Sequence, residues 1–255
     1  MSNITRNRSF IGGGGIYFRE VGATEGFIPV GNAEELAFAI SEDKKTQRNY
    51  QSPGGGNIAS QSAITDVTAT LTALSFQPET LAVALRALVV THTGSAQAGE
   101  THKAHADRLI RLNHLLDAEQ SITVTNAGAT VTYVAGTDYQ IKQSAIWIPA
   151  TSNIPNIDQA GGEDIVINYT SLTYYSVQSL TKAGVEYEIY FDGFNDADDG
   201  KLVTVSCHKV KFSPAAALGL ITEDYANLPL TFEVLADTSK DGTSESQYFD
   251  VNMAS

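Results

Sequence analysis

Two runs of alternating apolar and polar residues flank a glycine-rich segment in the first third of the chain. The first run covers residues 33–41 and the second covers residues 59–76. Successive side chains of a β-strand point to opposite faces, so a period of two places one face in a core and the other in water. We therefore expect a long two-faced hairpin, with a polar tip over residues 42–57.

The two faces of this hairpin differ in chemistry. The apolar face is expected to pack in a core, and it carries Leu36, Phe38, Ile40, Val67, Ala69, Leu71 and Ala73. The other face is small and polar, and it carries Glu35, Ala37, Ala39, Ser41, Asp66, Thr68, Thr70 and Thr72. Such a two-faced surface indicates a sheet that assembles with other sheets rather than the pocket of an enzyme.

One amphipathic helix is predicted over residues 78–88. Proline suits the first helical position, and Glu79 complements the positive end of the helix dipole. Leu81, Leu85 and Leu88, with Ala84, form an apolar stripe that would lie on a sheet. A second, shorter helical piece is predicted over residues 214–221.

The remaining segments read mainly as strands and turns. Residues 95–105 are small and polar and are expected to form a loop, while residues 108–117 fit either a helix or a strand. Short strands joined by turns follow from residue 121 to about residue 170, and two longer ones are expected at 185–193 and 201–212. We therefore expect a mainly β protein with one or two short helices.

The pattern also suggests a division of the chain. Residues 1–15 are polar and then glycine-rich, so they are expected to be a flexible N-terminal arm. The four glycines at its end are not a phosphate-binding loop, because no Lys-Ser or Lys-Thr follows them. The main domain is expected to combine residues 16–95 and 176–255, with residues 96–175 as an inserted or peripheral β subdomain.

Composition excludes several classes of function. The 255 residues include 16 Lys and Arg against 29 Asp and Glu, which gives a net charge of −13. Proteins that grip nucleic acid neutralise phosphates with cations, so tight DNA binding is not expected. The N-terminus has no apolar leader, and no stretch approaches the roughly 18 apolar residues of a membrane span.

Candidate chemistry is sparse. The only cysteine, Cys207, lies in a strand-like run and is expected to act as a small buried hydrophobe. His102 and His105 lie near His114 but are expected in a solvated loop, and the aspartates of residues 192–200 lack the spacing of a calcium loop. No GxSxG, HExxH or CxxC motif is present. We expect no catalytic residue, metal or cofactor.

Three segments, in order, resemble the major tail tube proteins of long-tailed, siphovirus-like bacteriophages. They are the hairpin whose tip ends in YQSPGGG (residues 50–56), the middle pattern TYVAGTDYQI…AIWIP…DIVINYTS, and the closing pattern YEIYFDGFNDADDGKLVTVSCHKVKFSPAAALGLI…LPLTFEVLAD…QYFDV. The resemblance spans about residues 10–252.

The resemblance implies a structural virion protein of the viral tail, with a tail-tube β-sandwich or barrel fold. Such proteins self-assemble into hexameric rings that stack into a hollow tube, the conduit for DNA ejection. Implied partners are further copies of the chain, the tape measure protein and phage DNA in the lumen, and other tail proteins at the tube ends. The protein would be made in the bacterial host cytoplasm and would reside in the virion tail.

The resemblance also gives the hairpin two expected roles. The polar face would line the lumen, through Glu35, Ala37, Ala39, Asp66, Thr68, Thr70 and Thr72. The loop at residues 43–56 would reach an acidic surface of the adjacent ring, through Lys44, Lys45, Arg48, Tyr50, Pro53, Gly54, Gly55 and Gly56.

Two alternatives remain open from the sequence. In the first, the chain is another tail ring component, a terminator or distal tail protein, which stops at one layer. Alternatively, the middle subdomain is an outward-facing module that binds the host surface. Trp147, Tyr133 and Tyr139 would then be exposed, whereas we expect them in a core.

Overall fold

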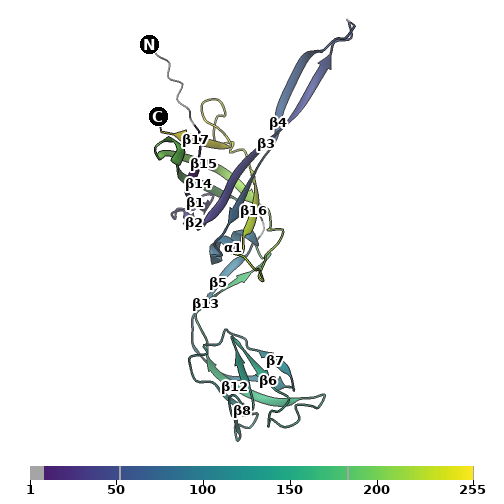
Figure 1. Cartoon of the computed structure of the whole chain (residues 1–255), viewed down its shortest axis with the longest axis vertical. Helices are drawn as coiled ribbons and strands as arrows, with labels where there is room; N and C mark the ends of the chain where they lie inside the picture. The colour runs from purple at the N-terminus through teal and green to yellow at the C-terminus, as the bar shows by residue number, and fades with distance from the viewer. Residues whose placement is uncertain (1–8, 52, 183, 255) are drawn as a thin grey trace. The chain divides into compact units, whose positions relative to one another are not determined.

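The computed structural model describes residues 9–51, 53–182 and 184–254. Strands make up 51% of the structure and helix 4%, so the predicted mainly β fold is confirmed. The chain divides into two compact units (Figure 1): unit 1 combines Met1–Val89 with Val177–Ser255, and unit 2 is Val90–Ser176. The division predicted from the sequence placed the corresponding boundaries at residues 95/96 and 175/176.

Unit 1 is built on one antiparallel sheet in the order β2-β1-β14-β15-β16-β4-β3, with β17 also paired to β15. Its strands are β1 (Gly12–Glu20), β2 (Ile28–Pro29), β3 (Ala33–Arg48), β4 (Asn57–Ala73), β14 (Tyr187–Asn195), β15 (Lys201–Phe212), β16 (Leu228–Val234) and β17 (Phe249–Met253). A short 3-10 helix, η1 (Asp196–Asp198), joins β14 to β15. Among the described residues the sheet stays open and forms no closed barrel.

Alternate residues of these strands bury one face of the sheet. β16 shows the pattern most clearly, because its odd-numbered residues are exposed while Leu228, Leu230, Phe232 and Val234 are buried. Phe232 lies at the centre, with its ring 5.0 Å from that of Phe212 and 6.4 Å from that of Phe38. Burial of this apolar face is the main source of stability of unit 1.

The helix of unit 1, α1 (Pro78–Ala84), is shorter than the sequence predicts. Arg86 leaves the helical region with φ 47°, and its guanidinium donates hydrogen bonds to the Phe212 carbonyl at 2.8 and 3.3 Å. The predicted apolar stripe is confirmed in part: Ala84 is buried and Leu81 and Leu85 pack against the core of unit 1. It is wrong at Leu88, which is exposed and lies in the strand that follows the helix. This helix is not long enough to cross a membrane, and the described residues contain no other α-helix.

The helical piece predicted over residues 214–221 is also wrong, because this described segment is irregular. Leu220 is 82% exposed and Ile221 98%, so the segment buries little of its apolar surface. A short run that contains glycine does not hold a helix without such burial.

Unit 2 is a small β-sandwich. One sheet has the order β6-β12-β8-β9 and the other the order β10-β11-β7. Its strands are β6 (Ala96–Ala104), β7 (Arg108–Arg111), β8 (Thr123–Asn126), β9 (Thr132–Tyr133), β10 (Gln140–Lys142), β11 (Ala145–Ile148) and β12 (Glu163–Thr170). Both sheets contribute to a single core, in which Ile146, Ile148, Ile165, Ile167 and Val124 are fully buried.

The sequence missed β6, which it predicted as a loop. In the described sheet β6 pairs with β12 alone, so it is an edge strand whose outward residues stay polar. Its polar composition therefore resembles that of a loop. The ambiguous segment at residues 108–117 forms a strand only in its first four residues, as β7. The chain passes between the units twice, through the paired strands β5 (Leu88–His92) and β13 (Tyr174–Gln178).

Candidate assembly surfaces

β3 and β4 continue past the core of unit 1 as a two-stranded arm of residues 42–64 (Figure 1). Paired residues run from Glu42 and Ile64 at its base to Arg48 and Asn57 near its tip. The predicted loop at residues 43–56 is therefore too long, since only residues 49–56 form the tip. A ribbon exposed on both faces needs no apolar alternation, so the pattern predicted the β4 side of the arm from residue 59 but not its β3 side at residues 42–48.

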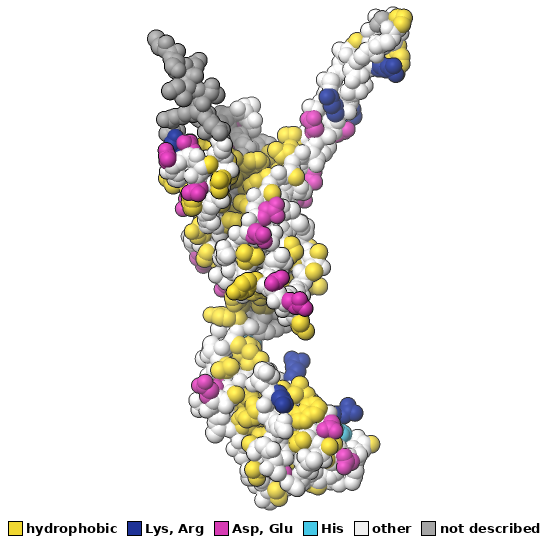
Figure 2. Space-filling view, in the orientation of Figure 1, with side chains coloured by type: hydrophobic (Ala, Val, Ile, Leu, Met, Phe, Trp, Pro, Cys, Tyr) yellow, Lys and Arg dark blue, Asp and Glu magenta, His cyan; other side chains and the backbone are white. Residues whose placement is uncertain are grey.

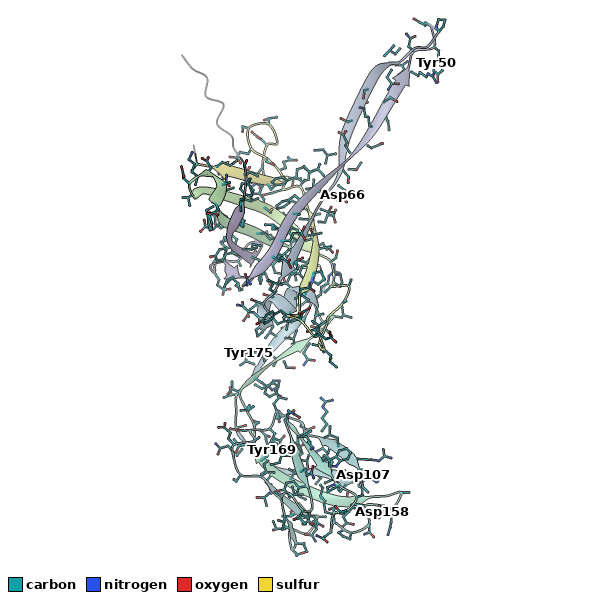
Figure 3. All side chains as sticks on the ribbon, viewed as in Figure 1. Tyr50, Asp66, Asp107, Asp158, Tyr169 and Tyr175 are labelled. Atoms are coloured by element: carbon teal, nitrogen blue, oxygen red, sulfur yellow. The ribbon has the colours of Figure 1, made fainter. Side chains whose placement is uncertain are left out.

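The arm carries all eight residues predicted for contact with another ring. Lys44, Lys45 and Arg48 lie on β3, while the tip holds Tyr50, Pro53, Gly54, Gly55 and Gly56. Tyr50 is 87% exposed and stands at the far end of the arm (Figure 3). At the tip, the backbone N–H of Asn49 donates to the Gly56 carbonyl at 2.8 Å.

The arm leaves apolar side chains in water. Ile58 and Ile64 are more than half exposed, as is Ile40 just before the base of the arm, which the sequence expected in the core. That expectation is wrong because the core ends near Phe38, before β3 leaves the body of unit 1. An isolated two-stranded hairpin is only marginally stable in water, so this arm is suited to being covered by a partner.

The charge of the arm differs from that of the remaining chain. Residues 42–64 hold three cations and two acids, a net charge of +1, while the whole chain carries −13 and the rest therefore −14. Figure 2 shows Lys and Arg side chains toward the tip and Asp and Glu side chains nearer the base. An acidic surface of another copy is thus electrostatically complementary to the outer arm.

The predicted polar face forms a continuous surface across β3 and β4. The register pairs Glu35 with Thr72, Ala37 with Thr70, Ala39 with Thr68, and Ser41 with Asp66. All these side chains are exposed except those of Thr68 and Thr72, which are half-buried. On the opposite face of β4, Val67, Ala69, Leu71 and Ala73 are buried, as the alternation predicts.

The sequence did not predict that this surface extends onto a third strand. β16 places Pro229 beside Thr72, Thr231 beside Thr70 and Glu233 beside Thr68. Beyond it, Lys211 of β15 pairs with Glu233. The alternation of Leu228, Leu230, Phe232 and Val234 with Pro229, Thr231 and Glu233 was the available signal, but the partner strand was not readable from it.

A groove lies beside the open ends of the sheet. It has a volume of about 600 Å³ and is lined mainly by apolar side chains, including those of Leu36, Phe38, Phe191, Val205, Val251 and Met253. β3 pairs only with β4, and β2 pairs with only two residues of β1, so both flanking strands keep unpaired edges within the described part of the chain. Such edges are templates for pairing with another chain.

The glycine run at residues 12–15 belongs to β1, so the predicted flexible arm of residues 1–15 is wrong from Gly12 onward; residues 1–8 lie outside the described residues. Gly14 lies opposite Gly193 of β14. A Cβ atom on Gly14 would lie 2.4 Å from the Asp192 carbonyl oxygen, so the close approach of the two strands requires glycine.

The residues considered for catalysis or metal binding include Cys207 and His102, and these two are buried or hydrogen-bonded within the fold. Cys207 is buried, and burial raises the pKa of its thiol to about 12, which keeps it protonated and unreactive. His102 lies on β6 and not in the predicted loop, with Nε2 2.6 Å from Oε1 of Glu100. The described residues contain no group of three His, Cys, Asp or Glu side chains placed to hold a metal ion.

Glu100 is the centre of a hydrogen-bond network in unit 2. Besides His102, it accepts from the Tyr169 hydroxyl at 2.7 Å and the Asn113 backbone N–H at 2.9 Å. Burial alone would raise the pKa of Glu100, but these bonds outweigh it and hold the pKa below its usual 4.5. Burial and the bond to Glu100 raise the pKa of Tyr169 to about 12.

This network predicts an acid-sensitive unit 2. Because the pKa of Glu100 is lower in the folded than in the unfolded chain, its stabilisation is present above pH 4.5 and is lost as pH falls below it. Urea unfolding of Glu100→Gln should show a shallower loss of stability between pH 5 and 3 than the native chain, whereas Glu119→Gln, an exposed control, should not. Equal acid limbs for Glu100→Gln and the native chain would contradict this assignment.

The fold therefore defines a class: an antiparallel two-unit β protein with a projecting hairpin arm and open sheet edges. The chain matches, over residues 9–252, the family described as "Protein of unknown function UCP028589", and it belongs to that family. No curated protein matches the chain.

Proposed function

We propose that this chain is the major tail tube protein of a long-tailed bacteriophage, a structural virion protein and not an enzyme. Copies of the chain form hexameric rings, and the rings stack into the hollow tube through which DNA is ejected. The observation that carries the proposal is the arm of residues 42–64, which projects from unit 1 with exposed isoleucines and an excess of cations.

Within this proposal, the arm of one copy binds the acidic body of a copy in the next ring. Lys44, Lys45 and Arg48 supply the charge that the −14 of the remaining chain attracts. The apolar side chains of the arm gain stability when the neighbour covers them. The unpaired edges of β3 and β1 join neighbouring copies within a ring, so the open sheet of one chain becomes part of a closed assembly.

The polar face of β3, β4 and β16 lines the lumen in this arrangement. It is rich in threonine and alanine and carries the acids Glu35, Asp66 and Glu233. Among the residue pairs named above, the one cation beside this face is Lys211 of β15, next to Glu233. A surface with more acids than cations does not hold phosphates, so DNA slides along it. The tape measure protein occupies the same channel before ejection, and other tail proteins bind the tube ends.

The competing structural role is a tail component that forms a single ring, such as a terminator or distal tail protein. The arm favours the tube, because a segment that reaches the next identical ring gives open-ended stacking. In either role the protein is made in the host cytoplasm and resides in the virion tail.

Negative-stain electron microscopy of the purified, concentrated full-length chain tests the proposal, with light scattering on the same sample. Hollow tubes of varying length, or stacks of six-membered rings, are the expected result. Single rings that never stack would favour the terminator or distal tail alternative. A monomer that stays monomeric when preformed tail tubes are added as nuclei would overturn the assembly role.

A further inference from the structure

The outer face of the three-stranded sheet in unit 2 carries the features of a binding surface, independently of the assembly role. The register sets Gln140, Trp147 and Leu109 in one row across β10, β11 and β7. Two residues further along, on the same face, it sets Lys142, Ala145 and Arg111 in a second row. The alternate residues Ile146 and Ile110 are buried in the core of unit 2. Side chains of the two rows therefore point away from that core.

Trp147 is the unexpected member of this surface. Tyr133 and Tyr139 are buried as the sequence predicts, but Trp147 is only half-buried and lies outside the core cluster. Its ring stacks on no aromatic ring and no cation of the described residues. Leu109 beside it is 55% exposed, so the two side chains make an apolar strip in contact with water.

The cations of this sheet are unpaired. Unit 2 has four Lys and Arg residues, and one of them, Lys103, pairs with Asp164 on the other sheet at 2.7 Å. Arg108, Arg111 and Lys142 are exposed and make no ion pair with any described residue. Figure 2 shows Lys and Arg side chains bordering a hydrophobic patch on unit 2. Arg108 is in register with the buried Ile148, so it lies on the other face and the outer face holds two free cations, Arg111 and Lys142. In a chain of charge −13, two free cations beside an exposed apolar strip point to an anionic ligand.

We propose that this face, Trp147 with Leu109, Gln140, Arg111 and Lys142, binds an acidic polysaccharide. The apolar face of a sugar ring stacks on the indole, the Gln140 amide bonds its hydroxyls, and Arg111 and Lys142 pair with its acidic groups in the adjacent row. Nucleic acid fits less well, because its affinity depends on many phosphate contacts with Lys and Arg, and this face offers two cations. Such a surface would attach the virion to a charged cell-surface glycan.

Trp147 is the only tryptophan, so its fluorescence reports directly on the site. Polygalacturonate added to the full-length chain at low salt should shift or quench this emission saturably, and added salt should reverse the effect. Neutral dextran should have little effect. In gels that contain polygalacturonate, Trp147→Ala should lose most of the retardation of the native chain.

Substitutions of single cations provide the matched comparison. Lys142→Gln and Arg111→Gln should each weaken binding at least about fivefold, whereas Lys103→Gln, an equal loss of charge on the other sheet, should bind like the native chain. The proposal would be overturned by no response to polygalacturonate, by equal weakening in Lys103→Gln, or by tighter binding of a single-stranded DNA oligonucleotide. A change in self-association by Lys142→Gln without loss of glycan binding would also overturn it, by assigning the face to contacts between copies.

Discussion

Replacement of residues 43–63 by an Asn-Gly turn is expected to abolish tube assembly and leave the monomer folded. The new turn joins Glu42 to Ile64, which are already paired, and Asn-Gly favours the tight turns that connect such strands. The removed residues are almost all exposed, so the melting temperature should change by no more than about 2 °C. Tubes should be absent in electron micrographs, because the contact between rings is lost.

A second variant separates the reach of the arm from its charge. Lys44, Lys45 and Arg48 changed together to Ser keep the ribbon but remove its cations. We expect tubes to form only at higher protein concentration, and with less dependence on salt than the native chain shows. Normal tubes from the shortened hairpin would end the proposed role of the arm, whatever the charge variant does.

Phe232→Ala is expected to cause the largest loss of stability of any single substitution in unit 1. Phe232 is 1% exposed and contacts the rings of Phe38 and Phe212. Removal of a buried phenyl ring costs about 4 kcal/mol, because the transfer energy is lost and a cavity remains. For a unit of this size the melting temperature should fall by about 10 °C in scanning calorimetry.

Thr231→Ala is the matched control on the same strand. Its side chain lies on the exposed face, so the unfolding free energy should change by less than about 0.5 kcal/mol. The transition of unit 2 should stay in place in both variants, since the two units have separate core clusters. A loss of stability in Thr231→Ala similar to that in Phe232→Ala would show that the polar face is packed, which contradicts its proposed exposure to a channel.

Local alternation predicted the β3 and β4 pair well because each strand has one buried face. Val67, Ala69 and Leu71 are buried, while Thr70 and Asp66 are exposed, as a period of two requires. Alternation did not predict the part of β3 beyond residue 41, where both faces of the ribbon are exposed to water. It also failed at β6, since the polar pattern of an edge strand resembles that of a loop.

The helices show the limit of local propensity. Residues 78–88 carry a good helical pattern, but α1 stops at Ala84 because Arg86 turns the chain and its guanidinium binds the Phe212 carbonyl. Phe212 lies 126 residues away, so no local pattern contains that contact. The segment at residues 214–221 packs Ala215 and Leu218 against the core but leaves Leu220 and Ile221 exposed, so too little burial was available to stabilise a helix.

The sequence by itself determined the mainly β class, the two-faced hairpin, the acidic balance and the burial of Cys207, because periodicity, charge and hydropathy act locally. Only the tertiary structure decided which strands adjoin. It set Thr231 and Glu233 beside the threonines of β4, and it gathered Trp147, Arg111 and Lys142 on one face of unit 2. Strand order and register depend on pairing between distant segments, and that pairing is fixed by the burial of both partners together.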